Sequence, residues 1–202
     1  MAPSDRPSTR AQRTKADLKA AIHFEIARSG TLDVAAVTEA AGLSQATFYS
    51  HFGSHDDALA AALDISLTNV TEVSRSIVNI ETILEMGLAD MIDLLVEQLV
   101  VAFGVEAPVL RVALARLSQN TTIRDVYRSH QSAHHLHLTK QLELGQRASV
   151  VRAGEPDQLA AALLVSAQGL NNPLLLRTDA NDETMSALKR ALLAILKPDA
   201  TS

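Results

Sequence analysis

The stretch AGLSQATFYSHFGSHDD, residues 41–57, carries the side chains of this chain best suited to meet a charged partner. It holds two Phe, one Tyr and two His, although the whole chain has only four Phe, two Tyr and no Trp. Phe48 and Phe52 lie four residues apart, so on a helix they share one face and are expected to form a small core. With that face buried, Tyr49 and His51 stay outside, where a phenol and an imidazole can bond phosphate oxygens.

The residues that precede the two phenylalanines suit the reading of bases in DNA. Ser44 is expected to cap a short helix over residues 45–51. Its first turn carries Gln45, Ala46 and Thr47, and in helix-turn-helix proteins that turn of the recognition helix meets base edges. Gln can bond adenine through two hydrogen bonds, and Ala or the Thr methyl can touch the methyl of thymine. The helix has no Lys or Arg, so positive charge has to come from elsewhere in the chain.

Two further segments must position this helix. A helix over residues 14–29 carries an apolar residue every four positions, and Gly30 is placed to end it. Asp33 can cap a second helix over residues 34–41, and Gly42 allows the sharp turn before the third. Two short helices joined by a turn that contains Gly predict a helix-turn-helix. The residues expected in its core are Leu18, Ile22, Ile26, Val34, Val37, Leu43, Phe48 and Phe52.

The rest of the chain also favours helices. Hydrophobic residues make up 47% of the chain, Gly and Pro are scarce, and no strand-like alternation occurs. Breaks are expected at Gly104, Pro108, Asn120 and residues 154–156, and Pro173 should end or kink its helix. The predicted helices span residues 55–79, 82–103, 107–119, 122–147, 156–176 and 181–197. The fold class expected is all-α, with a three-helix helix-turn-helix domain followed by a larger helical domain, about nine helices in all.

Composition narrows the class of protein. The 202 residues include no Cys, so neither a disulfide framework nor a thiolate nucleophile is available. No apolar run reaches membrane-spanning length, and the amino end lacks the apolar segment of a signal peptide, so a soluble cytoplasmic protein without a membrane partner is expected. The net charge of −5 is uneven, at +3 over residues 1–19 and −6 over residues 56–202. The basic end, with Arg10, Arg13 and Lys15, is expected to contact DNA phosphates.

The segment AGLSQATFYSHFGSHDDAL, residues 41–59, resembles the signature of the tetracycline-repressor (TetR) family of transcriptional regulators. The residues that coincide with that signature are Ala41, Gly42, Ser44, Thr47, Tyr49, His51, Phe52 and Ser54. The resemblance extends over residues 14–60. It departs at His55, which stands where the family usually has Lys, so a permanent charge near phosphate is replaced by a titratable one.

The resemblance implies a homodimeric regulator, usually a repressor, that is released from a palindromic operator in double-stranded DNA when a small molecule binds. Composition indicates a basic mobile arm over residues 1–13, and the resemblance implies a DNA-binding domain over 14–54 and a ligand-binding and dimerisation domain over 55–202. The last two helices are expected to pair with their mates across a two-fold axis. An apolar effector of unknown identity is expected, and neither a cofactor nor an enzymatic activity.

Three sets of residues are expected at these surfaces. The DNA-binding set is Arg10, Arg13, Lys15, Ser44, Gln45, Ala46, Thr47, Tyr49, His51 and His55. The ligand-pocket set is Met86, Met91, Phe103, Arg116, Tyr127, His130 and His134. The dimer-interface set is Leu159, Leu163, Leu170, Leu188, Leu192 and Leu196.

The segment SHQSAHHLH offers a different chemistry. His130, His134 and His137 fall within about 60° of one another on a helix. The spacing of His130 and His134 suits a metal ion, but the sequence identifies no further ligand, so they are weak candidates and no metal site is assigned. Two alternatives stay open: a histidine-based metal-binding sensor, and a helical hydrolase whose helix-turn-helix is vestigial. A hydrolase would need a carboxylate to orient the histidines, and no Ser-His-Asp order is visible.

Overall fold

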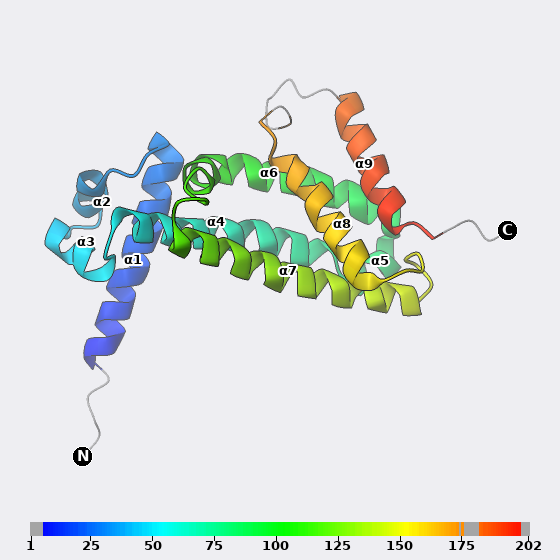
Figure 1. Ribbon diagram of the computed structural model, residues 1–202, viewed down its shortest axis with the longest axis horizontal. Helices are drawn as coiled ribbons and strands as arrows, with labels where there is room; N and C mark the ends of the chain where they lie inside the picture. The colour runs from blue at the N-terminus through cyan, green and yellow to red at the C-terminus, as the bar shows by residue number, and fades with distance from the viewer. Residues whose placement is uncertain (1–5, 174, 176–181, 199–202) are drawn as a thin grey trace, which may run out of the picture. The chain divides into compact units, whose positions relative to one another are not determined.

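The computed structural model describes residues 6–173, 175 and 182–198, which are mostly helical (Figure 1). No strand occurs among these residues, and the all-α fold class is confirmed. The helices are α1 (Arg6–Ser29), α2 (Val34–Ala40), α3 (Gln45–His51), α4 (His55–Ile77), α5 (Ile80–Met86), α6 (Leu88–Leu114), α7 (Thr121–Arg147), α8 (Pro156–Gln168) and α9 (Asp182–Leu196). A short 3-10 helix, η1 (Gly169–Asn171), follows α8 and ends just before Pro173, where a break was expected.

The chain divides into two compact units. Unit 1 comprises Met1–Leu67 and Glu106–Arg128, and unit 2 comprises Thr68–Val105 and Ser129–Ser202. Helices α4, α6 and α7 therefore each contribute residues to both units. The boundary expected after residue 54, between a DNA-binding domain and a ligand-binding domain, does not coincide with this division, and it stays a prediction.

In unit 1, α1 packs against α2, and α2 packs against α3 (Figure 1). Two glycines with positive φ shape the connections: Gly30, at 75°, follows the end of α1, and Gly42, at 64°, turns the chain between α2 and α3. Glycine adopts these angles readily because it has no Cβ. Val34 and Leu43 are half-buried. The fully buried side chains of the small core are Leu18, Ile22, Ile26, Val37, Phe48 and Phe52.

Helix α1 begins at Arg6 rather than near residue 14. Residues 6–13, expected to be a mobile arm, are therefore helical. Pro7 is compatible with this start because a proline in the first turn lacks only an N–H that would have no partner there. No Pro or Gly occurs between Pro7 and Gly30, so nothing in that stretch interrupts the helix.

The break expected at Gly104 and Pro108 is absent, and α6 runs through both residues. The break lies instead at Gly87, whose φ is 87°, directly after the short helix α5. Pro108 removes one donor, which leaves the carbonyl of Gly104 without its helical partner. Gly104 is exposed, so water can take that hydrogen bond and the helix continues.

In unit 2, α8 and α9 lie side by side (Figure 1). The unit has an aliphatic core, and four leucines expected at a dimer interface belong to it: Leu163, Leu170, Leu192 and Leu196 are buried there. The other two, Leu159 and Leu188, pack against the same core. A contact between two chains through α8 and α9 would therefore have to use the exposed residues of these helices.

None of the described helices combines the length and the apolar character that crossing a bilayer would require.

Candidate nucleic-acid interface

The amino end of α3 is fixed by Ser44. The Oγ of Ser44 accepts a hydrogen bond from the backbone N–H of Thr47 at 3.1 Å, which caps the helix as expected. The same Oγ lies 2.9 Å from Oγ1 of Thr47, so the two hydroxyls bond each other. The methyl group of Thr47 is then the part of that side chain left for an apolar contact such as a thymine methyl.

Helix α3 has one buried and one exposed face. Phe48 and Phe52 are buried, with ring centroids 5.3 Å apart, whereas Gln45 and Ala46 are exposed. Tyr49 is 49% exposed, and its ring meets that of Phe48 edge to face at 5.2 Å and 81°. This contact holds the Tyr49 ring in place and leaves its hydroxyl free to reach outward. The division into buried and exposed side chains follows the sequence-based expectation.

His51 and His55 flank the turn that leads into α4. His51 is half-buried at the end of α3, and His55 is the exposed first residue of α4. The Nε2 of His55 lies 3.3 Å from the carbonyl oxygen of Leu32, to which an N–H at that position donates. The ring therefore links the start of α4 to the loop before α2. Its positive form would stand at the place where a phosphate contact was expected.

Asp56, in the first turn of α4, is the anchor of a long-range contact that the sequence did not reveal. Nη2 of Arg116 donates to both carboxylate oxygens at 3.0 Å, and Nδ2 of Asn120 donates to one at 2.9 Å. The hydrogen bond from Arg116 is the main cause that lowers the pKa of Asp56. Arg116, expected in a ligand pocket, thus ties the connection between α6 and α7 to the start of α4.

Basic residues near this surface lie on α1. Arg13 and Lys15 are exposed there; Arg10 is on the same helix, but its side chain is outside the described part. Lys19 is engaged with Asp64, with Nζ and Oδ2 3.4 Å apart. The amino-terminal half of α1 therefore carries exposed positive charge, whereas α3 has no Lys or Arg.

A buried polar cluster holds α1 in unit 1. Glu106 is 3% exposed, and its Oε2 accepts from Oγ of Ser66 at 2.6 Å and lies 2.7 Å from Nε2 of His23. These three residues come from α6, α4 and α1. Sequence reasoning missed them because a single Glu in an apolar stretch carries no signal of a partner that is 83 residues away.

The residues expected to line one ligand pocket are divided between the two units. Arg116 and Tyr127 belong to unit 1 and the others to unit 2. Met91 is buried in the core of unit 2, Phe103 packs against it, and Met86 is exposed. A shared pocket for all of them stays a prediction.

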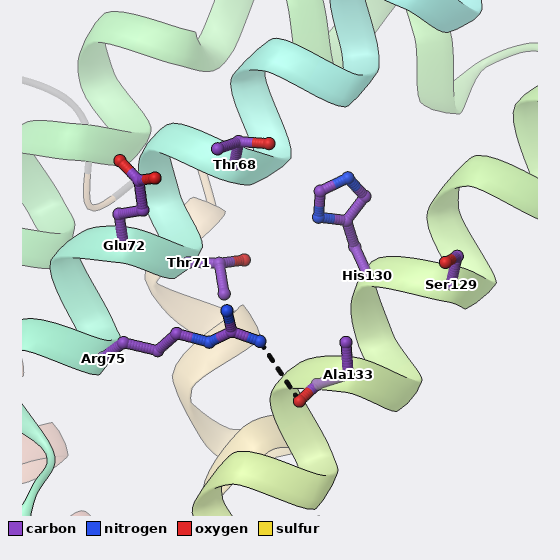
Figure 2. A pocket seen from close by; sticks show the side chains of 7 residues that line it. All are labelled: Thr68, Thr71, Glu72, Arg75, Ser129, His130 and Ala133. Carbon is purple, nitrogen blue, oxygen red and sulfur yellow. Dashed lines mark hydrogen bonds between the residues drawn. The ribbon is translucent and has the colours of Figure 1, made fainter.

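His130 does line a cavity of about 190 Å³ in unit 2, between α4 and α7 (Figure 2). Arg75 reaches across it and donates from Nη2 to the carbonyl oxygen of Ala133 at 3.3 Å. The remaining lining residues are Thr68, Thr71, Glu72 and Ser129. Its lining is polar, unlike the apolar pocket expected around these histidines.

The neighbouring histidines are each bonded to a protein group. Nε2 of His134 lies 2.9 Å from Oγ of Ser74, and Nε2 of His137 lies 3.2 Å from the carbonyl oxygen of Val78. Burial, with a smaller effect of Arg75, lowers the pKa of His134 to about 4. Among the described residues no three potential ligands gather around a point that could hold a metal ion.

Comparison with known proteins shows which solved structures share the fold of this chain. No family model matches the chain, and no curated protein matches it in sequence. Solved structures do match, and one described as a TetR-family transcriptional regulator, from Mesorhizobium loti, superposes with a TM-score of 0.69 at 14% identity over 93% of this chain and 98% of that one. GusR of Salmonella enterica gives 0.68 at 16% identity over 91% and 95% of the two chains.

A transcriptional regulator from Rhodococcus gives a TM-score of 0.63 at 21% identity over 93% of this chain and 99% of the other. The resemblance to TetR-family regulators that the signature indicates is therefore confirmed for the fold over 93% of the chain.

Proposed function

We propose that this chain is a DNA-binding transcriptional regulator of the TetR type that reads a double-stranded operator with α3. The observation that supports it most is the geometry of that helix: its amino end is capped by Ser44 and anchored by buried Phe48. The same anchoring leaves Gln45 exposed in the first turn, the part of a recognition helix that enters the major groove.

Two contact types are proposed for this surface. Gln45 and the methyl groups of Ala46 and Thr47 meet base edges. Tyr49, His51 and His55 meet phosphate oxygens, and Arg13 and Lys15 on α1 add positive charge. The solved structures with the same fold are transcriptional regulators, which favours this function over a fold used for something else.

We further propose that the regulator is a homodimer and, more specifically, a repressor released by a small molecule. A two-fold dimer presents two copies of α3, so its operator is pseudo-palindromic with half-sites about one helical turn apart. The effector in this proposal acts on residues outside α3 and shifts the equilibrium between DNA-binding and released forms.

A mobility-shift assay with DNA from upstream of the protein's own gene tests the proposal. The chain is expected to bind one pseudo-palindromic site, and Gln45→Ala should cost about 1–3 kcal/mol and relax the preference at one base pair in each half-site. Gln98→Ala, which removes an exposed Gln from α6, is the matched control and should bind like the parent chain. Equal binding of all three proteins would show that α3 does not read bases.

An enzymatic alternative finds little support in the polar clusters. Ser66 donates to Glu106 and not to His23, so the cluster lacks the contact between a nucleophile and its base that covalent hydrolysis needs. The metal-sensor alternative would need a third ligand beside His130 and His134. Thermal stabilisation of the chain by Zn²⁺ at stoichiometric concentration would favour that alternative over the organic effector.

A further inference from the structure

A pocket in unit 1 lies where α6 ends and α7 begins. Its cavity volume is about 460 Å³, within the range of roughly 300–1,000 Å³ that small organic ligands occupy. It is lined by Leu114, Leu117, Ser118, Arg124, Tyr127 and Arg128. All six residues belong to unit 1. The pocket is distinct from the cavity around His130, which belongs to unit 2.

Two guanidinium groups of this pocket have no counter-charge among the residues that the structure describes. The guanidinium groups of Arg124 and Arg128 make no hydrogen bond or ion pair with any described residue, and the adjacent Asp125 pairs with neither. The two arginines lie one helical turn apart, a spacing at which like charges repel. Arg124 also lies in the first turn of α7, the positive end of the helix dipole, where no acidic residue compensates it. An anion bound between them would relieve both unfavourable interactions.

The rest of the pocket lining includes apolar groups that an inorganic anion alone would not cover. Leu114 and Leu117 are half-buried and supply an aliphatic wall, and the ring of Tyr127 adds an aromatic one. A bare phosphate or chloride would leave these groups in contact with water. A ligand that carries an apolar body behind its anionic group covers them and gains the free energy of burying apolar surface.

The pocket is connected to the start of α4 through a short stretch of chain. Leu117 and Ser118 lie between Arg116 and Asn120, the two residues that donate hydrogen bonds to Asp56. Asp56 is in the first turn of α4, which directly follows the loop after α3. A ligand that moves Leu117 therefore changes the geometry of both bonds to Asp56.

We infer that this pocket binds an organic anion with an apolar body, such as a medium-chain or aromatic carboxylate, through Arg124 and Arg128. Occupancy loosens the hold of Arg116 and Asn120 on Asp56. The binding site stands whatever the chain regulates, whereas an effect on DNA affinity rests on the proposed function.

Isothermal titration of the full chain with decanoate and with 1-naphthoate, below the concentrations at which either aggregates, tests the site. Saturable binding of at least one of them is expected. Acetate offers the anionic group without the apolar body and decanol the body without the charge, so both should bind at least about tenfold more weakly. Absence of binding by both carboxylates, or equal binding of decanol, would overturn the inference.

A pair of double variants locates the site. Arg124→Gln with Arg128→Gln should weaken the binding of the carboxylate by at least about tenfold, because both charge-assisted hydrogen bonds are lost. Arg147→Gln with Arg190→Gln makes the same change of net charge at two exposed arginines of unit 2 and should leave binding unchanged. Circular dichroism checks that both variants keep their helices. Equal affinity of the two double variants would place the ligand elsewhere and refute the assignment.

The coupling is read from DNA affinity with and without decanoate. The parent chain should bind its operator more weakly in decanoate, and Asp56→Asn should still bind decanoate but lose most of that response. An undiminished response in Asp56→Asn would overturn the coupling. A chain that binds no DNA but still binds decanoate in an arginine-dependent way would refute the proposed function and keep the site. If neither carboxylate binds and the arginine variant loses DNA affinity instead, the arginines contact DNA and the inference is wrong.

Discussion

His134 shows how a single buried side chain couples the stability of unit 2 to pH. Its Nε2 bonds the hydroxyl of Ser74, and burial lowers its pKa from 6.5 to about 4, with further repulsion from Arg75 and His137. Because the unfolded chain binds this proton below pH 6.5 and the folded chain only near pH 4, the unfolded state takes up the proton first. The contribution of neutral, buried His134 to the free energy of unfolding is therefore complete above pH 6.5. It is lost progressively as the pH falls toward 4.

Replacing His134 by Gln removes this titration and keeps a group able to bond Ser74. Between pH 7.5 and 5 the free energy of unfolding should fall by about 2 kcal/mol more in the parent chain than in His134→Gln. Urea titrations at the two pH values measure it. His135→Gln, at the neighbouring half-buried position, is the control and should keep the parent slope. Identical slopes for all three proteins would show that His134 is accessible to protons in the fold.

Tyr49→Phe separates phosphate contacts from base contacts. The substitution keeps the ring that packs on Phe48 and removes only the hydroxyl, so the fold should be unaffected. Loss of one hydrogen bond to a charged phosphate is expected to cost about 1.5–3 kcal/mol on operator and unrelated DNA alike. Fluorescence anisotropy with both DNAs gives the two affinities. A variant that binds operator normally and loses only unrelated DNA would contradict the assignment.

The residues of α3 could be predicted because their roles are local. Ser44 caps, Phe48 and Phe52 are buried, and Tyr49 is exposed, all as expected from positions a few residues apart. The contacts of Asp56 could not be predicted, because Arg116 and Asn120 are 60 and 64 residues away. The sequence does not indicate which distant side chains will meet. The bond of Arg116 to Asp56 was accordingly not foreseen, and its place in a ligand pocket stays a prediction.

At the scale of elements, the start and end signals of short helices were more reliable than breaks inside long ones. The glycine turns and the caps of α2 and α3 lie where the sequence places them. Gly104 and Pro108 were read as a break, yet the structure accommodates both within α6 because the lost hydrogen bond faces solvent. A proline shows that one bond is missing; it does not show whether water can replace it.

Gly42 and Gly104 provide a matched test of this distinction. Both have open space where a Cβ would stand, so neither substitution clashes with a residue beyond its chain neighbours. Gly42 has a φ of 64°, so Gly42→Ala should destabilise the chain by about 1–2 kcal/mol. Gly104 lies within α6, so Gly104→Ala should stabilise it by about 0.5–1 kcal/mol. Thermal unfolding of both variants should show melting temperatures on opposite sides of the parent value.

At the scale of the whole molecule, the proposed homodimer depends on surfaces that the leucines of α8 and α9 do not provide. Those leucines are largely buried within unit 2. The exposed part of α8 carries Ala161, Ala162 and Val165, the last of which is 67% exposed. Small apolar side chains of this kind allow two helices to approach closely, which favours α8 as part of a two-fold contact.

Val165→Glu tests this assignment. Near a two-fold axis it places two like charges side by side, so the dissociation constant of the dimer should rise at least about tenfold. Sedimentation velocity over a concentration series measures the change. Leu136→Glu, which introduces the same charge at an equally exposed apolar residue of α7, should leave the dimer intact. If both variants sediment alike, α8 is not part of the interface. If the parent chain is a monomer, the proposal of a dimer is wrong.

The fold class and the helix-turn-helix could be predicted because both follow from periodicity and turn chemistry within short windows. The two units could not, since each is assembled from segments that are far apart in the sequence. Unit 1, for example, consists of two segments, Met1–Leu67 and Glu106–Arg128, which are separated in the sequence.

That discontinuity has a consequence during synthesis. Asp56 is synthesised well before Arg116 and Asn120, which follow 60 and 64 residues later. At about 5–20 residues per second the delay is roughly 3–12 s, long compared with the formation of a helix. Throughout that interval the nascent helix-turn-helix lacks the partners that later anchor α4. Chaperone capture of stalled chains should therefore be strongest before residue 128 has emerged from the exit tunnel.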